Sequence, residues 1–429
     1  MTRPIPTRLV MKFGGTSMGD LERIRRAARI VAAEANAGHK IAVVVSAMAG
    51  KTNELVAWTD GAGRPAPILR DQGIEMSDDE YDVVVASGEQ VTAGLLALTL
   101  RNMGLNARSW MGWQIPILTD DAHGRARIED VPGEVLGAAL DKGEIAIVPG
   151  FQGVTRDGRI TTLGRGGSDT SAVAVAAALD CPCDIYTDVD GVYTTDPRIE
   201  SRARRLEKVS YEEMLEMASL GAKVLQTRSV ELAMAKRVPV RVLSSFIEPD
   251  AAGNLPPKAG TLICDEEEIV EKRIVSGVTM SRDEARITLL GLADRVEGPA
   301  DVFTLLADAN VNVDMIVQSQ ARSEGAVNLT FTTGRRDAAR AADLVRAAQD
   351  QLGFEEIRVD QDVAKVSVVG VGMRSHAGVA QTMFRALADK GIKFQAISTS
   401  EIKISVLIDA AYAELAVRAL HSAYGLEAV

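Results

Sequence analysis

The chain has 429 residues, of which 46% are hydrophobic, and a formal net charge of −11 at pH 7. This length allows two or three domains, and the apolar content suffices for complete hydrophobic cores. The negative charge argues against nucleic acid and anionic membranes as partners. The sequence has no signal peptide or membrane-length apolar run, and its three cysteines lack a zinc-binding spacing. We therefore expect a cytoplasmic protein with free thiols.

Apolar strand-like runs alternate with amphipathic stretches through the first part of the chain. Strands are expected at residues 9–13, 41–46, 145–150, 159–163, 183–188 and 238–244, and helices at 22–33, 90–103, 171–179 and 210–220. This alternation predicts an α/β fold in which a mostly parallel sheet is covered by helices on both faces. Ligands of such folds gather at the carboxyl ends of the strands. Proline and glycine at 248–260 end this part or form a late hairpin, and the acidic run 265–268 begins a linker.

The first notable loop is the run KFGGTS at residues 12–17, between a strand and a helix. Paired glycines let backbone N–H groups approach an oxyanion, and Lys12 and Thr16 add charge and a donor. The helix that follows favours anions at its N-terminus. The pattern therefore indicates phosphate binding, although glycine turns of this kind also serve close packing alone.

A second loop, GRGGSDT, occupies residues 164–170 and again leads from a strand into a helix. Ser168 and Asp169 are good N-cap residues, so a purely structural role is available for them. That role leaves Arg165 unexplained. An arginine between glycines at the start of a helix is well placed to bind a carboxylate or phosphate in bidentate fashion.

Three further segments carry polar groups at strand ends. The run at 186–198 lacks the ligand spacing of a calcium loop, and its hydroxyl, acidic and aromatic groups suit adenine and ribose better. The run AGKT at 49–52 looks like the end of a P-loop, but Val45 stands where that motif needs glycine. Glu89 is expected to begin a helix, where a glutamate is usually no more than a partner of the helix dipole.

The last third of the chain contains an internal repeat. Residues 285–291 resemble 364–370, and residues 303–316 resemble 384–397. Each copy then adds a strand (327–332 and 402–408) and a helix (338–351 and 411–424). An additional strand at 273–280 precedes the first copy. Two modules of the type βαββα are predicted. The alternative for this part of the chain is a structural or dimerising appendage.

These loops, together with the runs EEMLE and GAKV within 208–224, resemble the aspartate kinases of the amino acid kinase family over essentially the whole chain. The repeats resemble ferredoxin-like βαββαβ ACT modules. The resemblance implies a kinase domain over 1–264, and ACT modules over 285–360 and 361–429. The stretch 265–284 would supply a linker and a strand that completes the second module.

The resemblance also implies a reaction, in which the γ-phosphoryl group of ATP passes to the side-chain carboxylate of L-aspartate. The product, 4-phospho-L-aspartate, begins lysine, threonine and methionine biosynthesis. Mg²⁺ should arrive with ATP, and we name no protein ligand for it. The implied catalytic residues are Lys12, Asp169 and Lys223. The implied ATP-binding residues are Lys12, Gly14, Gly15, Thr16, Ser168, Thr187, Asp188, Tyr193, Arg198, Lys223 and Val224. The implied aspartate-binding residues are Ser46, Thr52, Glu89, Arg165, Gly166 and Gly167.

Feedback inhibition by L-lysine or L-threonine is implied by the ACT modules, which would also assemble the chain into a homodimer or larger. The matching effector positions are Asp294, Gly298, Asn312, Val313, Asp314, Gln318, Val379, Ala380, Lys393, Phe394 and Ser400. Residues 295–299 read RVEGP where some relatives have KPGEA, which leaves the ligand of the first module open. The alternatives are another amino acid kinase, acting on glutamate or N-acetylglutamate, and a non-catalytic amino acid sensor.

Overall fold

The computed structural model describes residues 7–62, 78–220, 224–269, 274–321, 323 and 325–427. These residues form two compact units. The N-terminal unit contains residues 7–192, 205–218 and 224–269, and the C-terminal unit contains residues 193–204, 219–220 and the described residues from 274 onward. The short segment 193–204 thus belongs to the C-terminal unit, although both of its flanking segments belong to the N-terminal one.

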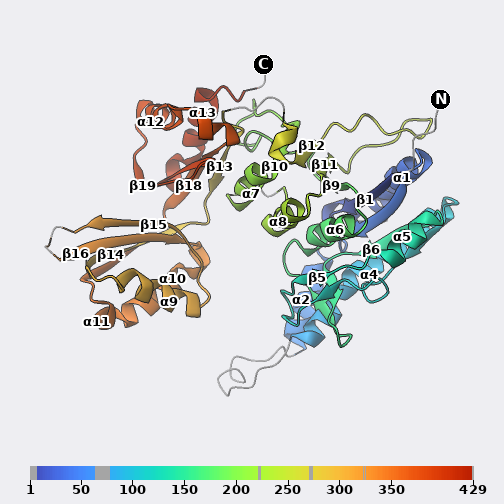
Figure 1. Ribbon diagram of the computed structural model, residues 1–429, viewed down its shortest axis with the longest axis horizontal. Helices are drawn as coiled ribbons and strands as arrows, with labels where there is room; N and C mark the ends of the chain where they lie inside the picture. Colours follow the sequence, from blue (N-terminus) through green and yellow to red (C-terminus); the bar gives the residue numbers. More distant parts are fainter. Residues whose placement is uncertain are drawn as a thin grey trace. The chain divides into compact units, whose positions relative to one another are not determined.

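An eight-stranded sheet forms the centre of the N-terminal unit (Figure 1). Its strand order is β10 (Lys208–Ser210), β12 (Thr261–Cys264), β11 (Val240–Ser244), β9 (Cys183–Thr187), β1 (Arg8–Phe13), β2 (Lys40–Val45), β6 (Ile145–Pro149) and β3 (Ala107–Ser109). Among these strands only the pairing of β11 with β12 is antiparallel. The central strands β1 and β2 are buried almost throughout, because parallel strands are covered on both faces.

Helices cover both faces of this sheet. The helices of this unit are α1 (Leu21–Asn36), α2 (Lys51–Gly61), α4 (Asp79–Asn102), α5 (Glu134–Asp141), α6 (Gly167–Ala178), α7 (Tyr211–Ser219) and α8 (Thr227–Lys236), of which α2 packs on α4. Met11 and Phe13 of β1 pack with buried residues of α1 and α4. Lys12 lies between them in sequence and therefore projects from the opposite face, where it meets Asp169 of α6.

Two helices begin earlier than the sequence indicates. Helix α4 begins at Asp79, so Glu89 lies in its interior and the expectation that this residue begins a helix is wrong. Helix α6 begins at Gly167, with Gly166 as its N-cap. Ser168 and Asp169 lie inside its first turn, so the capping role available to them from the sequence is wrong as well.

A second, small sheet lies beside the N-terminal end of α4. It joins β5 (Ile128–Asp130), β4 (Leu118–Thr119), β7 (Gln152–Val154) and β8 (Ile160–Thr162), of which only β8 was expected. The other strands have two or three residues, too few for a visible alternation of apolar and polar positions.

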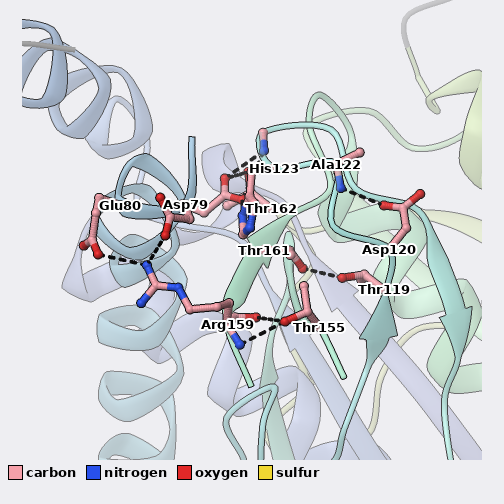
Figure 2. A network of polar contacts seen from close by, with 12 residues as sticks. Asp79, Glu80, Thr119, Asp120, Ala122, His123, Thr155, Arg159, Thr161 and Thr162 are labelled. Carbon is pink, nitrogen blue, oxygen red and sulfur yellow. Dashed lines mark hydrogen bonds and ion pairs between the residues drawn. The ribbon is translucent and has the colours of Figure 1, made fainter. Parts of the chain in front are cut away.

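A polar network joins this sheet to α4 (Figure 2). The side chain of Asp82 on α4 is fully buried and accepts hydrogen bonds from the Gly124 N–H at 3.0 Å and from the Thr162 hydroxyl, and it contacts His123 Nδ1 at 2.8 Å. Arg159 pairs with Asp79 at 2.7 Å and with Glu80 at 2.9 Å. One buried carboxylate therefore organises three segments that are far apart in sequence.

The C-terminal unit contains two four-stranded antiparallel sheets, each packed against helices. The first module consists of β14 (Ala285–Ala293), α9 (Gly298–Asp308), β15 (Val313–Gln320), β16 (Ala326–Thr333), α10 (Arg335–Ala347), α11 (Gln349–Leu352) and β17 (Glu356–Asp360), with strand order β15-β16-β14-β17. The second consists of β18 (Val363–Val369), α12 (Val379–Asp389), β19 (Phe394–Thr399), β20 (Lys403–Asp409) and α13 (Ala413–Ala423).

Strand β13 (Gly277–Ser281) precedes the first module in sequence but pairs with β18 of the second, whose strand order is β13-β18-β20-β19. The two modules also share a small apolar cluster in which Met315 of β15 packs with Ala396 of β19. Lys365 on β18, 5% exposed, pairs with Glu284 at 2.8 Å and with Asp314 of β15. The α/β fold with two ferredoxin-like modules is as predicted.

Helix α4 is long and apolar enough to cross a membrane by length and composition alone. Half of its most apolar window is buried, and it packs on α1, β6 and β8, which is typical of a core helix. All three cysteines are free and buried, as expected. Burial raises the pKa of Cys181 to about 12 and that of Cys183 well above its ordinary value, so these thiols stay protonated.

Replacing Asp82 with alanine is expected to destabilise the protein strongly, because His123, the Gly124 N–H and the Thr162 hydroxyl all lose their buried acceptor. The expected loss is about 3 kcal/mol in the free energy of unfolding, measured in urea. Asp130→Ala on exposed β5 is the control and should change little. Equal stability of the two variants would contradict the organising role of Asp82.

Candidate active site

The polar loops of the sequence come together at the carboxyl ends of β1, β2, β6 and β9. These four strands are parallel and adjacent, so their ends lie along one edge of the sheet. The loop 14–19 follows β1, residues 46–50 follow β2, Gly150 follows β6 and Asp188 follows β9. Helix α6 starts at the same edge, since a Cβ atom at Gly150 would lie 2.8 Å from Ser168 Oγ.

A buried ion pair lies at the centre of this edge. Lys12 Nζ is 2.5 Å from Asp169 Oδ1, and the two residues are 7% and 8% exposed. Asp169 stands in the first turn of α6, where the helix dipole favours a negative charge. A Cβ atom at Gly14 would lie 3.3 Å from the lysine nitrogen, so the glycine leaves room around the ammonium group.

Glycines also allow α6 to begin where it does. Gly166 has φ +74°, and a Cβ atom there would lie 2.0 Å from the side chain of Gln226. Any other residue would be both strained and in collision at this point. The turn is closed by the Asp169 N–H, which donates to the Gly166 carbonyl at 3.1 Å. The helix N-terminus is therefore fixed in position next to Lys12.

A second carboxylate at this edge has an unused oxygen. Glu89 is 3% exposed in the interior of α4, and its Oε1 accepts a hydrogen bond from the Ala47 N–H at 2.9 Å. Its Oε2 is buried without a hydrogen-bond partner within the described part of the chain. Burial raises the pKa of Glu89 from 4.5 to about 7. Such an atom is suited to a ligand that brings a cationic donor.

Ala47 connects Glu89 with the first glycine loop. A Cβ atom at Gly15 would lie 3.1 Å from the Ala47 carbonyl oxygen, so the glycine allows the loop to lie against the end of β2. Beneath the loop, Phe13 and Tyr186 stack with ring centroids 4.8 Å apart. The loop therefore rests on a rigid apolar support.

Other residues singled out in the sequence are less tightly placed. Arg165 is exposed and makes no hydrogen bond or ion pair with another described residue. Thr16 is exposed, Ser46 follows β2, and Thr52 stands in the first turn of α2. Thr187 ends β9 and donates to Asp188 Oδ1 at 3.2 Å.

Two candidates fall in the C-terminal unit, and one lies outside the described residues. Tyr193 and Arg198 belong to the segment 193–204, where exposed Arg198 pairs with Asp196 at 2.7 Å. Lys223 is not among the described residues, and the description resumes at Val224.

Ala47 and Gly150 were missed as parts of the site. Ala47 contributes only a backbone group, and Gly150 acts through the absence of a side chain, so neither has a motif. The sequence did hold a signal for the interior position of Glu89 in α4. Asp82 and Glu89 are two helical turns apart and therefore share one buried face of this helix.

Comparison with known proteins places this chain in a family. The amino acid kinase family profile matches residues 7–244, and ACT domain profiles match residues 286–350 and 366–424. The chain belongs to the amino acid kinase family.

Its relatives narrow the class further. The chain is 49% identical to an aspartate kinase of Pseudomonas putida over 98% of both chains. It is 46% identical to aspartokinase 2 of Bacillus subtilis, over 97% of this chain and 98% of the relative. Within the family it is an aspartate kinase with two ACT domains, as predicted, and neither another amino acid kinase nor an inert sensor is supported.

Solved structures of aspartokinases have a similar fold. E. coli aspartokinase III in complex with aspartate and ADP, in the R-state, matches with a TM-score of 0.76 at 30% identity, over 97% of this chain and 99% of that one. The same enzyme with lysine and aspartate, in the T-state, matches with a TM-score of 0.74 at 29% identity, over 96% and 98%.

Replacing Glu89 with glutamine is expected to stabilise the folded protein at alkaline pH. Because burial raises the pKa of Glu89, the folded chain holds this proton more tightly than the unfolded chain does, and stability falls as pH rises from 4.5 to 7. Above pH 7 the burial penalty is about 3 kcal/mol. Glutamine carries no charge, so the variant should lack this part of the pH dependence.

The measurement is urea unfolding of both proteins at pH 5 and pH 8. The stability difference between Glu89→Gln and the parent should grow with pH, whereas Glu207→Gln on the exposed surface should show none. Parallel profiles for Glu89→Gln and the parent would show that Glu89 does not titrate as described.

Proposed function

We propose that the edge around Lys12 and Asp169 transfers the γ-phosphoryl group of ATP to the side-chain carboxylate of L-aspartate. The buried pair of Lys12 with Asp169, at the carboxyl ends of parallel strands beside a glycine loop, is the observation that carries this proposal. E. coli aspartokinase III has been solved with aspartate and ADP, which supports the same two ligands here.

Catalysis at this edge consists of alignment and charge neutralisation. The attacking carboxylate is ionised at neutral pH, so it needs no general base. The two reactants are both anionic, and Lys12 and Lys223 offset the charge that gathers on the transferring group. Asp169 holds the Lys12 ammonium in place, because a lysine side chain has four flexible torsions and needs a fixed partner.

The amino acid substrate lies between Glu89 and Arg165. The unpartnered Oε2 of Glu89 accepts from the substrate ammonium, and Arg165, at the exposed mouth of α6, binds the α-carboxylate. Binding the ammonium lowers the pKa of Glu89, since a neighbouring cation favours the charged form. Ser46, Thr52, Gly166 and Gly167 complete this part of the site.

The nucleotide lies along the glycine loop and the end of β9. The backbone of Gly14, Gly15 and Thr16 meets the phosphates together with Lys12 and Ser168. The remaining nucleotide contacts in the N-terminal unit are Thr187, Asp188, Lys223 and Val224. Mg²⁺ comes as part of the substrate, Mg-ATP, held mainly by phosphate oxygens.

The C-terminal unit regulates this activity through amino acid end products. E. coli aspartokinase III in its T-state has been solved with lysine, which supports lysine as an inhibitor, and threonine is the second candidate. The effector candidates lie at the starts of α9 and α12 and along β15 and β19, the edge strands of the two sheets (Figure 1). Asp314 is already paired with Lys365 of the second module.

Edge strands with exposed Ile316, Phe394 and Ile397 also suit pairing with a second copy of the chain. A homodimer or larger assembly through these modules, in the cytoplasm, completes the proposal.

The experiment that tests the activity traps the acyl phosphate. The purified chain is incubated with Mg-ATP, hydroxylamine and either L-aspartate, L-glutamate or N-acetylglutamate, and the hydroxamate is measured. We expect product with L-aspartate alone. Product with another acid only would overturn the substrate, and absence of product with all three would overturn catalysis.

Lys12→Met should abolish most of this turnover. Loss of one cation at the transferring group raises the barrier by about 3 kcal/mol, or on the order of 100-fold in kcat. Lys142→Met on the exposed surface is the matched control and should keep full activity. Near-normal turnover of a folded Lys12→Met protein would remove Lys12 from the catalytic centre.

A further inference from the structure

Arg228, in the first turn of α8, holds two segments of the N-terminal unit together. Its Nη1 donates to the Leu163 carbonyl at 2.7 Å, and its Nη2 donates to the Ala126 carbonyl at 2.7 Å. Leu163 directly follows β8, and Ala126 lies in the loop between β4 and β5. Both residues are buried. One side chain therefore supplies the hydrogen-bond donors for carbonyl groups of two separate buried residues.

The two segments also touch each other at Gly164. This glycine has φ +74°, and a Cβ atom there would lie 3.3 Å from the Gly124 carbonyl oxygen. The Ala126 N–H donates to the Thr162 carbonyl at 2.9 Å, so the loop before β5 runs along the end of β8. Thr162 itself belongs to the network of Figure 2, in which its hydroxyl donates to Asp82. The start of the second glycine loop is thus held on two sides.

Helix α8 also supports the other end of that loop. The side chain of Gln226, the N-cap of α8, is so close to Gly166 that a Cβ atom there would lie 2.0 Å from it. The Gln226 carbonyl is fixed in turn, because it accepts from the Ser229 N–H at 3.0 Å and from the Ser229 hydroxyl at 2.7 Å. Arg165 lies between the two supports. Its backbone is therefore held by contacts that α8 makes on both sides of it.

Arg228 occupies this place without a carboxylate partner among the described residues. Burial lowers the pKa of Arg228, and the nearby charge of Arg127 lowers it further. Removing a guanidinium from water without a counter-ion costs free energy, which an apolar side chain would avoid. Packing alone therefore does not explain the arginine. Its donors lie in one rigid plane, so Arg228 fixes the two carbonyl groups relative to each other.

We propose that Arg228 is a positioning residue for L-aspartate binding, which holds Arg165 where it meets the α-carboxylate of the substrate. Arg228 does not touch the substrate itself. This inference rests on the role proposed above for Arg165 and adds the residue that orients it. The glycine loop after β1, proposed for ATP, makes no hydrogen bond with Arg228 in the described chain. Loss of Arg228 should therefore affect L-aspartate more than ATP.

Steady-state kinetics of the full chain in the hydroxamate assay test this difference. For Arg228→Met we expect kcat/KM for L-aspartate to fall by about tenfold or more, and KM for Mg-ATP to change by less than about twofold. Arg228→Lys keeps the charge but lacks the planar fork, and it should recover part of the loss. Lys236→Met, at an exposed position in the last turn of the same helix, is the matched control and should behave like the parent.

A double-mutant cycle separates positioning from a general loss of structure. In the Arg165→Met background, Arg228→Met should lower kcat/KM for L-aspartate little further, because Arg228 acts through Arg165. The full loss in that background, equal effects on L-aspartate and ATP, or no effect of Arg228→Met in the parent would each overturn the proposal.

Amide hydrogen exchange of the full chain without substrate gives a second measurement, which needs no turnover. Arg228→Met should speed exchange in the segment 163–167, while α1 exchanges as in the parent. Unchanged exchange in that segment, or faster exchange throughout the N-terminal unit, would contradict the holding role of Arg228. Absence of hydroxamate with the parent protein would instead overturn the activity proposed above, so the two failures are distinguishable.

Discussion

The pair of Lys12 and Asp169 is the interaction around which the catalytic half is arranged. It joins the end of the central strand β1 to the first turn of α6. An unpaired charge would be very costly at this depth, so each residue is acceptable only because the other is present. The glycines at 14, 150 and 166 follow from the same requirement, since they let strand ends and helix terminus come close enough for the pair to form.

The N-terminal unit also shows how one helix serves both stability and chemistry. On the buried face of α4, Asp82 has hydrogen-bond partners in β8 and in the loop between β4 and β5, while Glu89 keeps one oxygen without a partner among the described residues. The Asp82 carboxylate fixes the helix, and the Glu89 carboxylate has an oxygen that a ligand can bind. Burial of the Glu89 carboxylate costs stability in its charged form, and the raised pKa of Glu89 reflects this cost. Folded proteins tolerate such a cost chiefly where ligand binding offsets it.

Much of this organisation was predictable from the sequence, for identifiable reasons. Long apolar strands and the repeated pattern of the C-terminal modules gave the fold, because periodicity is strongest in long elements. Boundaries failed at α4 and α6, where tertiary packing extends a helix beyond its sequence pattern. The short strands β4, β5 and β7 and the backbone donor of Ala47 left no trace in the sequence. Thr52, proposed by resemblance, and Arg165, proposed from its glycine neighbours and its place before a helix, have no side-chain hydrogen bond or ion pair with a described residue that defines their roles.

The path of β13 has a consequence for how the C-terminal unit is built. Because this strand precedes the first module yet pairs with β18 of the second, the second sheet closes only after the whole first module has been traversed. Strand pairings across such long loops form slowly. The two modules are therefore expected to fold together. A shortened chain that starts after β13 would leave β18 with a bare edge, open to pairing with any other strand. The second sheet is therefore complete only in a chain that retains β13 together with both modules.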